Sequence, residues 1–279
     1  MGQIEQAIAQ NTLQIIEQGF YVNKQNQKIT IEELLHTAVA NTRLYTPEEL
    51  EQLPTRNKRN AMATTFEATH ETSLAAVKRM VQKGHPVMCL NFASATKPGG
   101  GFDNEIVSQE ESLVCASALY PCQLKAQGFY QYHKKQHTSL YSDHMIYSPD
   151  VPFFRNDEGD LIDQPFKASI LTAAAVNATL VHKLELQNIA LIEHDMRIRI
   201  RKMLTLCAVQ GYEHLVLGAW GCGTFGNDPE MIAELFREKL TDHFAGCFRH
   251  IVFAIKTDDD RIFQPFNTRF NGTMYYLMY

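Results

Sequence analysis

The sequence lacks the features that would assign it to a membrane-bound or secreted protein. No apolar run approaches the ~18 residues that a membrane-spanning helix needs, and the polar start MGQIEQAIAQ has no basic-then-apolar layout of a secretory signal. The six cysteines form no C-x-x-C pair, so we interpret them as reduced thiols, several of them in the core. We therefore expect a cytoplasmic protein that does not associate with a membrane.

An excess of positive charge is also missing. The chain carries 26 Lys and Arg against 31 Asp and Glu, a formal net charge of −5. A protein that holds DNA or RNA by bulk electrostatics is normally basic, so we expect no nucleic-acid partner, sequence-specific binding included. A small anionic ligand held by backbone N–H groups is still compatible with this charge. With 45% hydrophobic and 20% charged residues among 279, the composition indicates a globular protein with a sizeable core.

Alternating strand and helix patterns predict the fold class. From about residue 64 onward, nearly continuous apolar stretches such as VMCLNFAS alternate with helical patterns. This alternation predicts an α/β sandwich with a largely parallel or mixed sheet. Helices are predicted over residues 73–83, 123–135, 194–210 and 228–240, and before them a helix over 3–18, two short strands over 19–31 and a helix over 32–45. We expect residues 1–60 to form an N-terminal extension packed on a main domain of residues 61–279.

The segment KPGGGFDNEIVSQEES joins a glycine triplet to two adjacent acids. Gly99, Gly100 and Gly101 follow a predicted buried strand, and a seven-residue spacer separates them from the QEE triplet. Glycine permits positive φ angles and close approach of a ligand. In α/β sheets ligands bind at the carboxyl ends of the strands, where this loop lies. The combination favours a carboxylate held against a closely docked ligand over a turn that needs only flexibility.

A second glycine-rich loop, GAWGCGTFGNDPE, follows the predicted strand HLVLGAW and precedes a helix. It fits G-x-G-x-x-G, and consecutive bare amides near a helix N-terminus bind phosphate well. A Rossmann dinucleotide site is not favoured, because the motif lies late in the chain and no acid sits at the end of the next strand about 20 residues on. We predict a phosphate-binding loop that comprises Ala219, Trp220, Gly221, Cys222, Gly223, Thr224, Phe225 and Gly226.

The order and spacing of these motifs resemble the poly(ADP-ribose) glycohydrolases. PGGG, the spacer and QEES are similar to the signature of that family, and WGCGTFGND resembles its diphosphate-binding loop. Together with LYSDHMIYSPDVPFFR and TRLYTPEEL, they look like the microbial-type branch. The resemblance covers nearly the whole chain and implies a macrodomain-like, three-layer α/β/α sandwich with a mixed sheet. It also implies hydrolysis of ribose–ribose O-glycosidic bonds in poly(ADP-ribose), which releases ADP-ribose.

By this resemblance Glu111 is the catalytic acid, and Glu110 holds hydroxyls of the ribose that is cleaved. Adjacent helical residues point about 100° apart, so the two carboxyls cannot easily clasp one bond from opposite faces. We therefore expect Glu111 to act alone, first as acid and then as base. Ligand contacts are also predicted for Gln109, for Asn91, where animal members carry an acid, and for Ser94, near their ribose-contacting Asn.

Other residues are assigned no chemistry. His133 and His137 have the i, i+4 spacing of a zinc helix, but Lys134 and Lys135 between them repel a cation, so no metal and no cofactor are expected.

Phe225 stacks on the ligand or anchors the loop; both alternatives stay open. A binding module that recognises ADP-ribose without cleaving it and a hydrolase of mono-ADP-ribosylated macromolecules are the competing functions.

Overall fold

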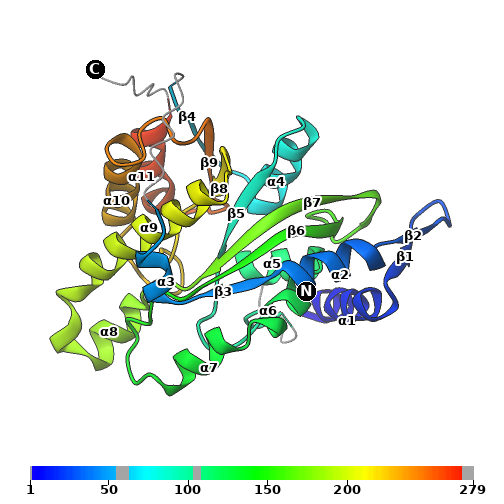
Figure 1. Cartoon of the computed structure of the whole chain (residues 1–279), viewed down its shortest axis with the longest axis horizontal. Coiled ribbons are helices and arrows are strands. Elements are labelled where there is room, and N and C mark those ends of the chain that lie inside the picture. The colour runs from blue at the N-terminus through cyan, green and yellow to red at the C-terminus, as the bar shows by residue number, and fades with distance from the viewer. Residues whose placement is uncertain (1, 55–62, 103–107, 272–279) are drawn as a thin grey trace.

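The computed structural model describes residues 2–54, 63–102 and 108–271 (Figure 1). The strands are β1 (Phe20–Val22), β2 (Lys28–Thr30), β3 (Arg43–Tyr45), β4 (Thr65–Thr69), β5 (Val87–Phe92), β6 (Met145–Arg155), β7 (Leu161–Ala173), β8 (His214–Leu217) and β9 (His250–Ala254). The helices are α1 (Gly2–Gln18), α2 (Glu32–Asn41), α3 (Pro47–Glu51), α4 (Ser73–Gln82), α5 (Gln109–Ala116), α6 (Leu119–Lys125), α7 (Gly128–Lys135), α8 (Ala178–Leu184), α9 (Leu191–Val209), α10 (Pro229–Thr241) and α11 (Asp260–Phe270).

A seven-stranded mixed sheet forms the centre of the protein, in the order β3-β6-β7-β5-β8-β9-β4. β5 lies in the middle and pairs in parallel with β7 and β8, whereas β6 is antiparallel to both of its neighbours. Helices α9, α10 and α11 lie on one side of the sheet, and α2, α4, α5 and α6 on the other (Figure 1). The predicted α/β/α sandwich with a mixed sheet is confirmed.

The apolar run in β5 is explained by burial on both faces. Met88 and Leu90 belong to the core cluster on the α9–α11 side, and Cys89 belongs to the cluster on the α4–α5 side. Successive strand residues point to opposite faces, so a strand covered by helices on both sides has no polar face. All six cysteines are free thiols and four are buried, as expected.

Several predicted boundaries are wrong, for local reasons. The helix predicted over residues 123–135 is two helices, α6 and α7, because the chain turns at Ala126 before Gly128 packs against Leu44. The helix predicted over 32–45 ends at Asn41, since the next residues pair as β3 with β6. The acidic run at 258–260 caps and begins α11, with Asp259 as its N-cap residue and Asp260 as its first residue.

Residues 2–54 are joined to the main sheet. β3 adds an edge strand beside β6, and α1 packs on α5, the helix that carries the QEE triplet. The domain division at residues 60 and 61 stays a prediction, and residues 55–62 lie outside the described part. Near the C-terminus, Phe263, Phe266 and Phe270 of α11 are buried in the core, and residues 272–279 lie outside the described part. Within the described ranges, no helix has the length and apolarity to cross a membrane.

Candidate active site

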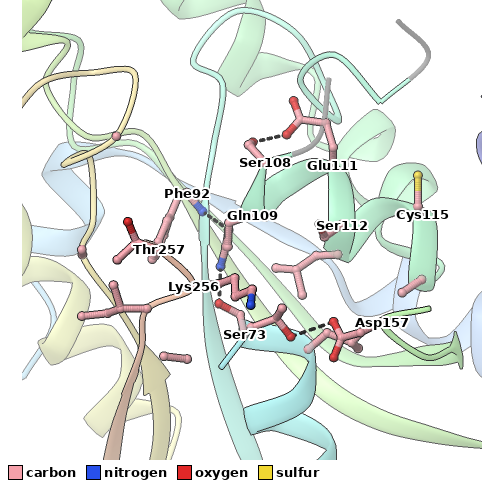
Figure 2. Close-up of a pocket in the computed structure, with 18 of the residues that line it drawn as sticks. Ser73, Phe92, Ser108, Gln109, Glu111, Ser112, Cys115, Asp157, Lys256 and Thr257 are labelled. Carbon is pink, nitrogen blue, oxygen red and sulfur yellow. Dashed lines mark hydrogen bonds between the residues drawn. The ribbon is translucent and has the colours of Figure 1, made fainter. Parts of the chain in front are cut away.

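The two glycine-rich loops leave the sheet side by side. β5 and β8 are parallel neighbours, so their carboxyl ends meet at the same edge, and the first loop follows Phe92 as the second follows Leu217. A cavity of about 840 Å³ opens there, lined by residues of both loops, by α5 and by the segment after β9. Figure 2 shows Glu111, Gln109 and Lys256 around it. The predicted meeting of the two loops is therefore present.

Glu111 is the carboxyl group held closest to the first glycine loop. It is the third residue of α5 and is 6% exposed, yet it lines the cavity. Its Oε1 accepts a hydrogen bond from the Gly101 N–H at 2.7 Å, and its Oε2 accepts one from the Ser108 hydroxyl. Both oxygens are thus oriented by donors from the segment that joins β5 to α5, with Gly101 in its middle and Ser108 at its end.

At Gly100 the loop has no room for a side chain. Its φ is +59°, and a Cβ atom there would lie 2.2 Å from Oε1 of Glu111 and 3.0 Å from Oε2 of Glu110. Any side chain at this position would displace the Glu111 carboxyl, in addition to the cost of a left-handed backbone. The bare backbone at Gly100 is therefore required by the carboxyl group itself.

Glu110 is directed into the protein interior. It is 2% exposed; its Oε1 accepts hydrogen bonds from the side-chain amides of Asn91 (3.1 Å) and Gln123 (2.8 Å), and its Oε2 accepts one from the Ser94 N–H (2.7 Å). Burial raises the pKa of Glu110 to about 7 in spite of these donors, and the Glu111 charge acts in the same direction. Three donors surround the carboxyl, so in this structure it fastens the loop after β5 to α5.

Gln109, Asn91 and Ser94 lie around the same junction. The Gln109 side chain accepts from the Phe92 N–H (2.8 Å) and donates to the Leu90 carbonyl (2.7 Å) and to the Ser73 hydroxyl (3.0 Å). It lines the cavity, whereas Asn91 and Ser94 are not among the described lining residues. Asn91 is fully buried, and its amide also donates to Thr172 at 3.1 Å. Their ligand contacts stay predictions.

The second loop offers unused backbone donors to the cavity. Within the described part of the chain, no hydrogen bond uses the N–H groups of Gly221, Gly223, Thr224 and Phe225. By contrast, the Cys222 N–H donates to the Ala219 carbonyl at 3.1 Å, and the Gly226 N–H donates to the Gly223 carbonyl at 2.8 Å. The free amides suit an anion. The Cys222 amide, which we expected to bind ligand, is used inside the loop.

Asn227 stabilises the conformation of this loop. Its amide donates to the carbonyls of Val176 (2.7 Å) and Gly221 (3.0 Å), which fixes the loop to the segment after β7. Ala219, Trp220, Gly221, Gly223, Thr224 and Phe225 all line the cavity. Phe225 is half-buried beside Tyr141, with ring centroids 6.0 Å apart. Burial raises the pKa of the Cys222 thiol, which agrees with a structural rather than a nucleophilic cysteine.

Sequence reasoning missed two residues of the site. Lys256 lines the cavity from the segment after β9, where it is exposed. The same rule that located the glycine loops, carboxyl ends of parallel strands, could have located it after the strand HIVFA. Ser108 is the other, and the sequence S-x-x-E at residues 108–111 was its signal. In the described part, no group of three or more His, Cys, Asp or Glu could hold a metal ion, and His137 lies beyond the end of α7.

Comparison with known proteins places these features in a family. The sequence matches the family model described as "Microbial-type PARG, catalytic domain" over residues 9–156. No protein with a curated description matches the chain. Among solved structures, the poly(ADP-ribose) glycohydrolase (PARG) from Thermomonospora curvata is 41% identical, with a TM-score of 0.91 over 96% of this chain and 100% of that chain.

Two ligand complexes are also similar. The Thermomonospora curvata protein bound to the inhibitor ADP-HPD has a TM-score of 0.89 at 41% identity, over 96% of this chain and 100% of that chain. The poly(ADP-ribose) glycohydrolase from Deinococcus radiodurans in complex with ADP-ribose has a TM-score of 0.82 at 39% identity, over 85% of this chain and 97% of that chain.

Proposed function

This chain belongs to the microbial-type poly(ADP-ribose) glycohydrolase family, and on that basis we propose that it hydrolyses ribose–ribose O-glycosidic bonds in poly(ADP-ribose) and releases ADP-ribose. The sequence prediction of family and fold is confirmed. The related proteins are complexed with ADP-ribose and with the inhibitor ADP-HPD. Poly(ADP-ribose) or an ADP-ribosylated macromolecule is accordingly the substrate, and ADP-ribose is the product.

The observation that carries this proposal is the position of one carboxyl group. Glu111 lines the cavity next to the bare backbone of Gly100, while free amides of the second loop lie in the wall of the same cavity. A nucleotide sugar whose diphosphate accepts from Gly223, Thr224 and Phe225 would place its distal ribose over the first loop. Glu111 is then the carboxyl that reaches the glycosidic oxygen.

Hydrolysis follows in two steps at this carboxyl. Glu111 gives its proton to the bridging oxygen, the C1–O bond breaks with its electrons on the leaving ribose, and an oxocarbenium-like centre remains at C1. The Glu111 carboxylate then removes a proton from a water molecule that attacks C1, which restores the acid and completes ADP-ribose. The nearby diphosphate stabilises the positive charge that develops at C1.

Glu110 acts beside this step. Its carboxyl accepts hydrogen bonds from the Ser94 N–H and from the side-chain amides of Asn91 and Gln123. These bonds fix the position of the first loop relative to the bound ribose. A contact from Glu110 to ribose hydroxyls, which the family resemblance implies, stays a prediction. Phe225 faces the cavity from the second loop and is the residue that we assign to pack against the nucleotide.

The test uses purified protein and two substrates. We expect poly(ADP-ribose) to yield free ADP-ribose, and the Glu111→Gln variant to lose turnover by several orders of magnitude while it still binds ADP-ribose. Turnover of Glu111→Gln within a few-fold of the parent protein would refute the role of Glu111.

A mono-ADP-ribosylated protein is the parallel substrate. ADP-ribose released from it alone would identify a hydrolase of mono-ADP-ribosyl groups. Binding of ADP-ribose with no release from either substrate would identify a recognition module. Both results would contradict the proposed function, so the pair of substrates separates the three hypotheses.

A further inference from the structure

Among the described helices, α3 and α5 carry the sequence of a capping box from the N-cap residue to the third helical residue, and only α3 forms it. In Thr46-Pro-Glu-Glu49, the Thr46 hydroxyl accepts from the Glu49 N–H at 3.3 Å and the Glu49 carboxyl accepts from the Thr46 N–H at 2.9 Å. These reciprocal bonds satisfy two of the donors that a helix start leaves without partners. At α5, Ser108 and Glu111 stand at the same two positions, yet the Ser108 side chain makes no capping bond.

The Ser108 hydroxyl has a different partner. It donates to Oε2 of Glu111, while the Gly101 N–H donates to Oε1 at 2.7 Å. The Glu111 carboxyl thus lies between the glycine loop and the N-cap residue of its own helix, and it bonds the Ser108 hydroxyl where a capping box would bond the Ser108 N–H. A stabilising feature of the helix is therefore replaced by a contact with the carboxyl of the cavity.

The two donors differ in chemistry. A peptide N–H can only donate, so the Gly101 N–H favours Oε1 as the oxygen that accepts and disfavours the acidic proton there. A hydroxyl both donates and accepts: it can donate to the carboxylate and, after rotation, accept from the carboxylic acid. The Ser108 hydroxyl can therefore keep its hydrogen bond to Oε2 in both protonation states of Glu111, whereas the Gly101 N–H bonds Oε1 as the oxygen without the proton.

We propose that Ser108 is a positioning residue for the acid–base step, which places the transferable proton on Oε2 of Glu111 and stabilises the carboxylate left after the proton is given away. This inference rests on the proposed role of Glu111. When Oε2 donates to the glycosidic oxygen, the Ser108 hydroxyl turns from acceptor to donor. When water attacks, the returning proton reaches Oε2 and the hydroxyl turns back.

Removal of the hydroxyl tests the proposal. In Ser108→Ala the ionised Glu111 loses a donor, so its carboxyl keeps the proton to higher pH, and the alkaline limb of the kcat profile moves up by about one pH unit. We expect kcat at neutral pH to fall roughly 10-fold with KM for poly(ADP-ribose) unchanged. Ser108→Thr retains a hydroxyl and restores both values.

Thr46→Ala is the matched control, because it removes a capping box that is formed away from the cavity. It should lower Tm by roughly 2–4 °C and leave the pH profile of kcat in place. Ser108→Ala should do the reverse, because no capping bond is lost with it. A fall in Tm for Ser108→Ala like that of Thr46→Ala, with an unchanged pH profile, would show a merely structural serine and overturn the proposal.

Ser108→Asp provides a second variant that favours folding, since Asp is a good N-cap residue but cannot donate when ionised. Its negative charge should move the alkaline limb at least as far as Ser108→Ala does, and the parental profile here would also overturn the proposal. Glu111→Gln separates this inference from the proposed function. If Glu111→Gln is inactive and the Ser108 variants behave as the parent protein, only the role of Ser108 fails.

Discussion

Gly100→Ala measures how closely the first loop must approach Glu111. The added Cβ would lie 2.2 Å from Oε1 of Glu111, and an ordinary contact begins at 3.4 Å, so the carboxyl must move by 3.4 − 2.2 = 1.2 Å. That movement also breaks the 2.7 Å hydrogen bond from the Gly101 N–H. Misplacement of a catalytic group by ~1 Å costs on the order of 100-fold in rate. We therefore expect kcat to fall roughly 100-fold.

Backbone strain must be separated from this displacement. Alanine at a left-handed position costs ~1–2 kcal/mol, and Gly100 has a φ of +59°. Gly84 is the matched control, because its φ is +82° and a Cβ there would meet nothing within 4 Å. Gly84→Ala should lose a similar free energy of unfolding and keep its activity.

The assay is release of ADP-ribose from poly(ADP-ribose), with thermal unfolding measured on the same samples. Gly100→Ala should be folded and nearly inactive, and Gly84→Ala should be folded and active. A Gly100→Ala protein with turnover within a few-fold of the parent would show that the Glu111 carboxyl can act as acid and base from another position. The close approach of loop and acid would then have no catalytic meaning.

Three further predictions concern the second loop, a cation and a buried acid. Gly223→Ala should weaken ADP-ribose binding in calorimetry roughly tenfold with Tm unchanged. A Cβ there meets no protein atom within 4 Å but crowds the exposed amides that we propose to bind the diphosphate; unchanged affinity would argue against that assignment. Lys256→Ala should weaken the same binding by about 2–5-fold, an effect that fades at high salt because the lysine is exposed; a loss that persists at high salt would contradict a screened charge. For Glu110, burial holds the pKa at about 7 in the folded protein, above the ordinary 4.5. The stability that this carboxyl contributes is therefore fully present below pH 4.5 and is lost as pH rises through 7, a loss on the order of a few kcal/mol. The free energy of unfolding of Glu110→Gln, relative to that of the parent protein, should therefore increase as pH rises from 5 to 8. A difference between the two proteins that stays constant over this pH range would refute this.

The sequence predicted the fold because its pattern is locally consistent. A strand such as β5, buried on both faces, must be apolar throughout, and helices that alternate with such strands can only cover the sheet. The loops after β5 and β8 meet for the same reason, because parallel neighbours end at one edge. Glu111 at the cavity follows from this geometry together with the family signature.

The directions of individual side chains could not be predicted. Glu110 and Glu111 are adjacent and identical, and only the packing of α5 on β5 turns Glu110 toward Asn91 and Gln123 and Glu111 toward the cavity. The strand β3 was missed because three residues carry little periodicity, and its pairing with β6 is a tertiary contact. Lys256 was missed because it follows a strand end that no glycine-rich motif marks in the sequence.

The most direct test of the central claim is a crystal structure of the protein with ADP-ribose bound. The account predicts diphosphate oxygens about 3 Å from the amides of Gly223, Thr224 and Phe225, and the distal ribose with its C1 hydroxyl within hydrogen-bond reach, about 3 Å, of the Glu111 carboxyl. A nucleotide held by the second loop with its distal ribose directed away from Glu111 would contradict it.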